Sequence, residues 1–339
     1  MRICIATLLA IMVLDAASAE PKPRGTLVLH FDNDTFTGQD DHYTSGVVLG
    51  LVCADLNDFA GLPLPAWMSK GLRRLPGIGR DDRIKRLGLS LGQHLFTPSE
   101  LEAEPPGPDD LPYSAHLLAT ATVSGEGPER LDGWSLVVGT VGSAAFGRPT
   151  QQLVHTLTNS TIAEGWDYQM GSEVVVNLGY EHRHRLWRAH NDAKQPRADL
   201  IYRTSVQAGT HHSTLTLGLQ WRLGMVPDDL AFQARLFGDE LLGVRSDRAR
   251  GLRPWSVHGM ASLDATLIAH AFHLDGSLFD HDDPQVDHDH LRLRAQAGIE
   301  LATGRWGFLA ALVLQRIPWT PPDDRRIGHF GSARLTYRF

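Results

Sequence analysis

Apolar residues recur at every second position along much of the chain, and this alternation is the main signal in the sequence. In residues 43–52, Val47, Leu49 and Leu51 share one face, while the other face carries smaller or polar side chains. The same period of two recurs at residues 87–92, 173–181, 214–222 and 291–300. Because the side chains of a β-strand point alternately to opposite faces, the pattern predicts an all-β chain.

The two faces of these strands differ in a way that indicates a membrane protein. One face is apolar throughout and the other is small, polar or charged, and many segments end in Trp or Tyr. Strands of about 10 residues or longer with this pattern are typical of barrels with lipid outside and a polar lumen inside. Backbone groups in lipid must all be paired, so the sheet has to close. The sequence therefore predicts a transmembrane antiparallel β-barrel.

We count about 12 candidate strands, and an even number is typical of a single-chain bacterial barrel. They are residues 25–34, 43–53, 85–96, 113–124, 131–144, 171–185, 197–208, 212–223, 255–268, 289–302, 304–316 and 329–339.

The two ends of the chain agree with an outer-membrane location. Arg2, the apolar stretch 3–14 and the Ala-Ser-Ala site at 17–19 predict a signal peptide, followed by one barrel domain over residues 20–339. The chain ends in an alternating strand closed by an aromatic residue, Phe339, as outer-membrane barrels do. We therefore expect the protein in the bacterial outer membrane.

Composition alone gives a different impression from periodicity. The chain has 339 residues, 42% hydrophobic, a net charge of -7 and only 2 Cys, which is also compatible with a soluble protein. The acidic balance argues against nucleic-acid binding. Cys4 leaves with the signal peptide, so Cys53 has no partner for an internal disulfide. A closed sheet would supply the stability instead.

Strand parity predicts which connections share one end of the barrel. With both termini in the periplasm, the connections after odd-numbered strands face outside: 35–42, 97–112, 145–170, 209–211, 269–288 and 317–328. The inner connections 54–84 and 224–254 are long, and we expect surface helices there, for example around Pro65–Arg74.

The first candidate site lies at the turn between the first two strands. Asn33 and Asp34 end the first strand and Thr44 starts the second, so three oxygen-bearing side chains meet around one turn. Strict alternation points Asp34 and Thr44 inward and Asn33 outward. Ordinary turn chemistry also explains Asn and Asp at such a place.

The second and third candidate segments lie on the next two outer loops. Thr97-Pro98 and Pro112–Ala115 frame the second loop. In the third, Thr150 can cap a short helix on which Gln151 and His155, four residues apart, share a face. A histidine there can act as a general base, although a lone surface histidine is more often structural.

Together these segments resemble the lipid A 3'-O-deacylase family of Gram-negative outer membranes. The matching pieces are Asn33-Asp34, Tyr43-Thr44-Ser45-Gly46, Thr97-Pro98, Pro112-Tyr113-Ser114-Ala115, Gln151-x-x-x-His155 and Gly165-Trp166. The resemblance implies a calcium-dependent hydrolase that removes the 3'-linked acyloxyacyl chain from lipid A of lipopolysaccharide. It also implies an active site that faces the cell exterior, and we expect a monomer.

The resemblance assigns a role to each candidate residue. His155 would activate water with Gln151 in support, and Asn33, Asp34 and Thr44 would supply or orient the oxygen-rich site that Ca²⁺ requires. The cation would polarise the ester carbonyl and hold the oxyanion. The family is expected to place a lysine in the second loop, yet residues 97–112 contain no Lys or Arg. Arg148 on the third loop is the candidate substitute.

Two other functions fit the same sequence. A Ser-His esterase would use Ser45 or Ser114 as nucleophile near His155. A non-enzymatic barrel, such as a narrow pore or an adhesin, would use none of these residues. The acidic, His-rich stretch 280–290 suggests either cation bridging to lipopolysaccharide or a solvated loop. Trp187, Trp221 and Trp306 are expected to belong to the aromatic girdle at the membrane interface.

Overall fold

The computed structural model describes residues 24–34, 42–62, 64–158, 163–230, 241, 242, 244, 255–280, 282–321 and 326–339. The predicted signal peptide, residues 1–19, lies outside the described residues. Within them, no helix is long and apolar enough to cross a membrane.

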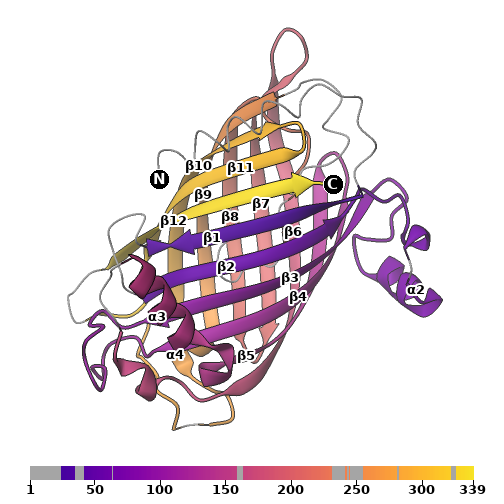
Figure 1. The fold of residues 1–339 in the computed structure, drawn as a ribbon. Coiled ribbons are helices and arrows are strands. Elements are labelled where there is room, and N and C mark those ends of the chain that lie inside the picture. Colours follow the sequence, from indigo (N-terminus) through magenta and orange to yellow (C-terminus); the bar gives the residue numbers. More distant parts are fainter. Residues whose placement is uncertain are drawn as a thin grey trace.

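Twelve strands form one closed antiparallel barrel, as the alternation predicts (Figure 1). Each strand pairs with its neighbours in sequence, and β1 closes the barrel on β12 through pairs from Thr26–Arg338 to Asn33–Gly331. The strands are β1 Gly25–Asn33, β2 His42–Cys53, β3 Ile84–Thr97, β4 Ser114–Glu126, β5 Arg130–Val141, β6 Glu173–His190, β7 Pro196–Gly209, β8 His212–Gly224, β9 Trp255–Ala271, β10 Leu291–Thr303, β11 Trp306–Arg316 and β12 Ile327–Arg338.

The outer face of the wall is apolar. Leu49 is 59% exposed, Leu89 62% and Val174 68%, as expected for side chains whose solvent is lipid rather than water. The rim at which β1 begins and β12 ends, here called the terminal rim, carries a ring of Trp residues. Trp187, Trp221 and Trp306, the residues expected in the girdle, lie there, and so do Trp134 and Trp255.

The lumen is filled with paired charges. Arg222 donates to Asp199 at 2.6 and 2.9 Å, and Arg185 donates to the same carboxylate at 3.2 Å, all three side chains being buried. A buried ion that keeps its partner avoids most of the desolvation cost, whereas one that loses it is strongly destabilising. The charged lumen face is therefore compatible with a narrow barrel only because its members pair across strands.

The connection between β8 and β9 enters the lumen near the terminal rim. Leu230 packs against Leu131 and Ile201, its N–H donates to Glu126, and its carbonyl accepts from Arg183 at 2.8 Å. Further along the connection, Leu242 and Val244 pack against the lumen-facing Val28, Val48 and Val52. The prediction of a surface helix in residues 224–254 is therefore wrong for the described part of that connection.

The connection between β2 and β3 carries the helix expected around Pro65–Arg74. A short 3-10 helix, η2 (Phe59–Gly61), precedes α2 (Ala66–Arg74), which stands outside the barrel at the terminal rim (Figure 1). The opposite rim, here called the loop rim, carries α3 (Gly147–Thr158) and α4 (Phe272–Asp275). The two rims thus differ sharply in what surrounds them.

An arginine on the lipid face tests this orientation of the wall. Leu49→Arg, near the middle of β2, is expected to lower the free energy of unfolding by about 2–4 kcal/mol, because it puts a charge in hydrocarbon. Leu223→Arg, two residues beyond Trp221 at the rim, should cost only about 0–1 kcal/mol. Guanidinium titrations in phospholipid vesicles measure both, and equal losses would contradict the assigned depth.

Candidate functional site

The third connection at the loop rim lies against the outside of the barrel wall. It contains η3 (Gly142–Ala145), the predicted short helix α3, and η4 (Gly165–Tyr168), and α3 crosses the ends of the strands near β2 and β3 (Figure 1). Gln93 fixes this placement, since it shares the lipid-facing side with Leu91 and its Nε2 donates to Ala145 O at 2.7 Å.

An apolar cluster holds the segments on both sides of α3 to the wall. Leu95 and Ala115, from the outer side of β3 and β4, pack with Ala145 and with the fully buried Trp166. The rings of Tyr113 and Trp166 lie 4.9 Å apart, and the Tyr113 hydroxyl donates to Leu101 O at 3.0 Å. These contacts give a structural role to Tyr113, Ala115 and Trp166, which the motifs above contain.

The first residue of α3 has to be small. A Cβ on Gly147 would lie 2.5 Å from Ala115 Cβ and 2.5 Å from the Trp166 ring. Only glycine lets the helix start this close to the wall, and that closeness sets the depth at which the next turn of the helix lies.

The polar face of α3 is turned toward the wall. Gln151 and His155 are only 2% and 5% exposed, whereas Leu153 is 62% exposed and points away. Trp166 Nε1 donates to Gln151 Oε1 at 2.6 Å. Gln151 Nε2 is buried and has no hydrogen-bond partner among the described residues. The expected shared face of Gln151 and His155 is thus present, and it lies between helix and barrel.

The turn between β1 and β2 contributes the oxygen-bearing residues. Asp34 and Thr44 are almost fully buried and Asn33 is half-buried. Asn33 Nδ2 donates to Thr44 O at 3.0 Å, and the hydroxyls of Thr44 and Thr97 lie 2.6 Å apart. The backbone therefore brings the motif residues Asn33, Thr44 and Thr97 together. Thr97, which the sequence offered only as part of the Thr97-Pro98 motif, thus contacts a candidate site residue directly.

A β-bulge at Thr44 breaks the strict alternation on which its inward direction was predicted. Tyr43 pairs with Phe96 and Ser45 with Leu95, which leaves Thr44 as the extra residue. Thr44 meets Thr97, which belongs to the outer side of β3 with Leu95. The prediction that Thr44 points into the lumen is therefore wrong, because the bulge shifts the register.

Tyr43 takes the inward place that the bulge creates. Its hydroxyl donates to Asp32 Oδ2 at 3.1 Å and lies 3.0 Å from His94 Nδ1, both inside the barrel. A Cβ on Gly46 would collide with the Tyr43 hydroxyl. Glycine at 46 is thus the sequence signal that the tyrosine folds back over its own strand.

The donor set at this site consists of hard oxygen atoms. Asn33, Asp34 and Thr44 offer amide, carboxylate and hydroxyl or carbonyl oxygens, which fit Ca²⁺ better than a transition metal. Among the described residues, no group of three or more His, Cys, Asp or Glu is arranged to hold a metal ion. A cation here would be held by one carboxylate and by neutral oxygens.

Comparison with known proteins is decisive at the family level. The model of the family described as outer membrane protein LpxR matches residues 3–339. The chain belongs to the LpxR family. The structure of LpxR from Salmonella typhimurium is similar over 93% of this chain and 100% of that chain, with TM-score 0.71 and 14% sequence identity. At that identity the likeness shows the fold alone, a closed outer-membrane barrel.

Other outer-membrane barrels are less similar. The β domain of the Bordetella autotransporter BrkA aligns with 94% of this chain and 100% of its own at 11% identity, with TM-score 0.40. The translocator domain of NalP from Neisseria meningitidis aligns with 100% of this chain and 96% of its own at 10% identity, also with TM-score 0.40. No curated protein sequence matches the chain. Membership of the LpxR family indicates that the protein lies in the outer membrane and modifies lipid A.

In this LpxR family member, Ser114 lies on the other side of the wall from α3. It is fully buried, and its Oγ lies 2.7 Å from His116 Nε2 rather than against His155. His116 Nδ1 lies 2.7 Å from His211 Nε2. Burial, and next the neighbouring His212, hold the pKa of His211 well below its ordinary value. Ser114 therefore belongs to a lumenal histidine chain. Ser45 lies opposite Asn33 and Leu95.

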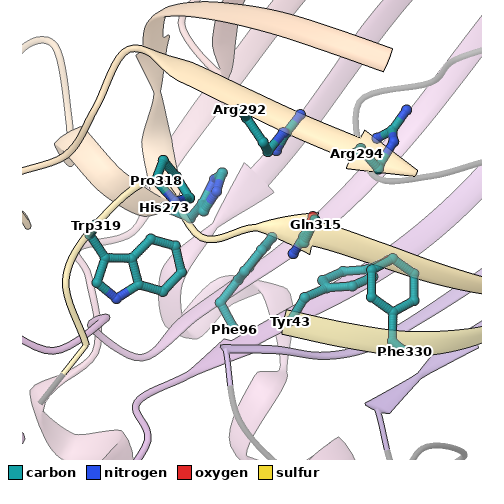
Figure 2. A pocket seen from close by; sticks show the side chains of 9 residues that line it. All are labelled: Tyr43, Phe96, His273, Arg292, Arg294, Gln315, Pro318, Trp319 and Phe330. Atoms are coloured by element: carbon teal, nitrogen blue, oxygen red, sulfur yellow. The ribbon is translucent and has the colours of Figure 1, made fainter. Parts of the chain in front are cut away.

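The lumen at the loop rim also contains a pocket. Figure 2 shows Arg292 and Arg294 of β10 beside a group of aromatic side chains that includes Tyr43 and Phe96. Arg294 lies 3.8 Å from Asp264. None of the five predicted site residues lines this pocket, so it is separate from the α3 site.

The acidic, His-rich stretch ties the outer connections together. Asp283 accepts from Gly171 N at 2.8 Å, and Asp289 accepts from Arg316 at 2.6 Å. His288 lies 2.9 Å from Asp275, which raises the pKa of His288. The described part of this stretch therefore has a structural role. Arg148, the candidate phosphate ligand, is paired with Asp167 at 2.5 Å on the exposed surface.

The Trp166–Gln151 bond offers a direct test of how α3 is held. Trp166→Phe keeps a ring in the cluster but leaves Gln151 Oε1 buried without its donor, at a cost of about 1–3 kcal/mol. We expect hydrogen exchange in α3 to rise about 5- to 150-fold while the strands stay protected. Trp187→Phe, at the opposite rim, is the control. Unchanged exchange in α3 would show that the bond does not hold the helix.

Proposed function

We propose that the protein hydrolyses the ester at the 3' position of lipid A and releases the acyloxyacyl chain, with Ca²⁺ as its cofactor. The observation that carries the proposal is the reversed polarity of α3. Gln151 and His155 are buried against the barrel wall while Leu153 and Val154 are exposed beside it. A hydrolytic pair placed on the outer side of the wall can meet a lipid without the lipid entering the lumen.

His155 is proposed as the general base. Its imidazole accepts a proton from water as the water oxygen attacks the ester carbonyl. The bond between the acyl carbon and the 3' oxygen then breaks, and the proton passes to the departing alkoxide. The products are the free acyloxyacyl acid and the 3'-hydroxyl of lipid A, so the reaction needs no serine and no further reactant.

Gln151 is proposed as a positioning residue. The bond from Trp166 fixes its Oε1 and so directs Nε2, which is buried without a partner among the described residues. A buried donor in that state costs free energy unless a ligand satisfies it. Nε2 is therefore suited to donate to the attacking water or to a substrate oxygen.

Asn33, Asp34 and Thr44 are proposed to hold or orient the cation. The bond from Asn33 to Thr44 O keeps these groups together at the turn, and the amide of Asn33 then presents its Oδ1 as the acceptor. Bound Ca²⁺ would polarise the ester carbonyl and stabilise the oxyanion. Arg148 would have to leave its ion pair with Asp167 in order to bind a lipid A phosphate.

The loop rim is proposed to face the cell exterior, because lipid A occupies the outer leaflet. The three motif connections lie at that rim, and both ends of the sheet, β1 and β12, start and finish at the other. In this orientation α3 lies beside the outer leaflet, where the substrate is.

Replacement of His155 tests the base. His155→Ala is expected to lower the rate of lipid A deacylation about 10²–10⁴-fold, because proton transfer is lost while the barrel is unchanged. Mass spectrometry of lipid A incubated with the purified protein and CaCl₂ measures the loss of the acyloxyacyl mass. His190→Ala, at the terminal rim, should keep full activity. No mass loss with the wild-type protein would refute the enzyme and favour a non-enzymatic barrel.

Calcium removal separates the proposal from a serine esterase. EDTA should abolish deacylation and excess CaCl₂ should restore it, while Ser45→Ala should retain activity. Ser45 is the relevant serine because it lies opposite Asn33, whereas Ser114 is bonded to His116 inside the barrel. Activity that survives EDTA but is lost with Ser45→Ala, or with a serine-directed reagent, would favour the Ser-His alternative.

A further inference from the structure

Helix α2 is fixed to the lipid-facing side of the wall at the terminal rim, far from α3 (Figure 1). Leu72 and Leu75 pack on an apolar cluster that includes Leu87, Val123 and Trp134. Trp134 Nε1 also donates to Pro76 O at 3.2 Å, just after the helix. The base of α2 is therefore part of the membrane-facing surface of the barrel.

The opposite face of α2 combines an indole with cations. Trp67, Lys70 and Arg74 lie at positions i, i+3 and i+7, so they share one side of the helix, and Trp67 is 74% exposed. The helix has no Asp or Glu. Arg73 pairs with Asp58 at 2.6 Å, but Lys70 and Arg74 have no carboxylate partner among the described residues.

The depth of α2 follows from Trp134. Together with Trp221, Trp255 and Trp306, Trp134 forms the aromatic ring at this rim, and such rings lie at the level of lipid headgroups. Because Leu72 packs in the same cluster as Trp134, α2 lies next to that level. At this level exposed Lys and Arg side chains can reach lipid phosphates, and Trp is enriched at the membrane interface.

We propose that α2 binds anionic phospholipid headgroups of the periplasmic leaflet through Lys70, Arg74 and Trp67. The charge pattern carries this inference, because a chain with net charge -7 presents here a helix with three cations and no acidic residue. Juxtamembrane cations are attracted to anionic leaflets. The leaflet assignment rests on the proposed orientation of the barrel, while the headgroup chemistry rests on α2 alone.

The test compares two double variants of the full-length protein in neutral detergent. Lys70→Gln with Arg74→Gln removes the two cations of α2. Lys194→Gln with Arg197→Gln, called the β6–β7 variant, removes two exposed cations three residues apart at the same rim. Lys194 lies in the β6–β7 connection and Arg197 at the start of β7. Native mass spectrometry measures binding of dioleoyl phosphatidylglycerol against dioleoyl phosphatidylcholine for each protein.

The wild-type protein and the β6–β7 variant should both prefer phosphatidylglycerol. The α2 variant should bind it about 30-fold more weakly, since each cation near an anionic surface contributes about a factor of five. Trp67→Phe should lower the quenching of tryptophan fluorescence by brominated phosphatidylglycerol by the share of this one indole, because the tryptophans of the barrel wall at the same rim remain. The proposal is overturned if the wild-type protein binds both lipids equally or if the α2 variant keeps its preference.

Two controls keep this test independent of folding and catalysis. Heat-modifiable migration in gels should be the same for all variants, which shows an intact barrel. Lipid A deacylation should also be unchanged in the α2 variant, because α2 and α3 lie at opposite rims. A preference lost equally in both double variants would show a general charge effect and would also overturn the α2 assignment.

Discussion

Closure of β1 on β12 is the constraint on which the rest of the molecule depends. In hydrocarbon an unpaired backbone N–H or C=O costs several kcal/mol, so a membrane sheet is stable only without edges. The register from Thr26–Arg338 to Asn33–Gly331 removes the last edge. Closure then divides every strand into a lipid side and a lumen side, and each long connection has to lie at a rim, in the lumen or against the outer wall.

These three locations explain the distribution of polar groups. Inside the wall there is little room for water, so Arg222, Asp199 and their neighbours pair with one another and the β8–β9 connection supplies apolar and backbone contacts. Ser114 and His116 contact each other within this lumenal network. Outside the wall, Gln151 and His155 lie on the side of α3 that faces the barrel. A membrane lipid can meet side chains on that outer side without entering the lumen.

Periodicity was sufficient for the barrel but not for its local exceptions. The number of strands and their approximate bounds follow from period-two alternation. Helix α2 was expected from the length of its connection, and α3 from Thr150 and the spacing of Gln151 and His155. The bulge at Thr44 does not, because alternation assumes a constant register, and one inserted residue reverses the faces of Tyr43 and Thr44. Gly46 is the local signal that could have revealed it. The sequence also did not show that residues 225–230 enter the lumen, because a segment in a polar lumen and a segment on a water-exposed surface contain similar residues.

The two surface helices show why an amphipathic pattern has no fixed meaning near a membrane. A helix on a water-soluble protein turns its apolar side inward. Helix α2 does so, with Leu72 on the wall and Lys70 outside, whereas α3 buries Gln151 and His155 and exposes Leu153 and Val154. The difference follows from the surroundings of each helix. Beside hydrocarbon, an exposed leucine is already in its preferred solvent, so polar groups gain most from the protein side. At the headgroup layer the ordinary polarity returns, because charges there meet water and phosphates.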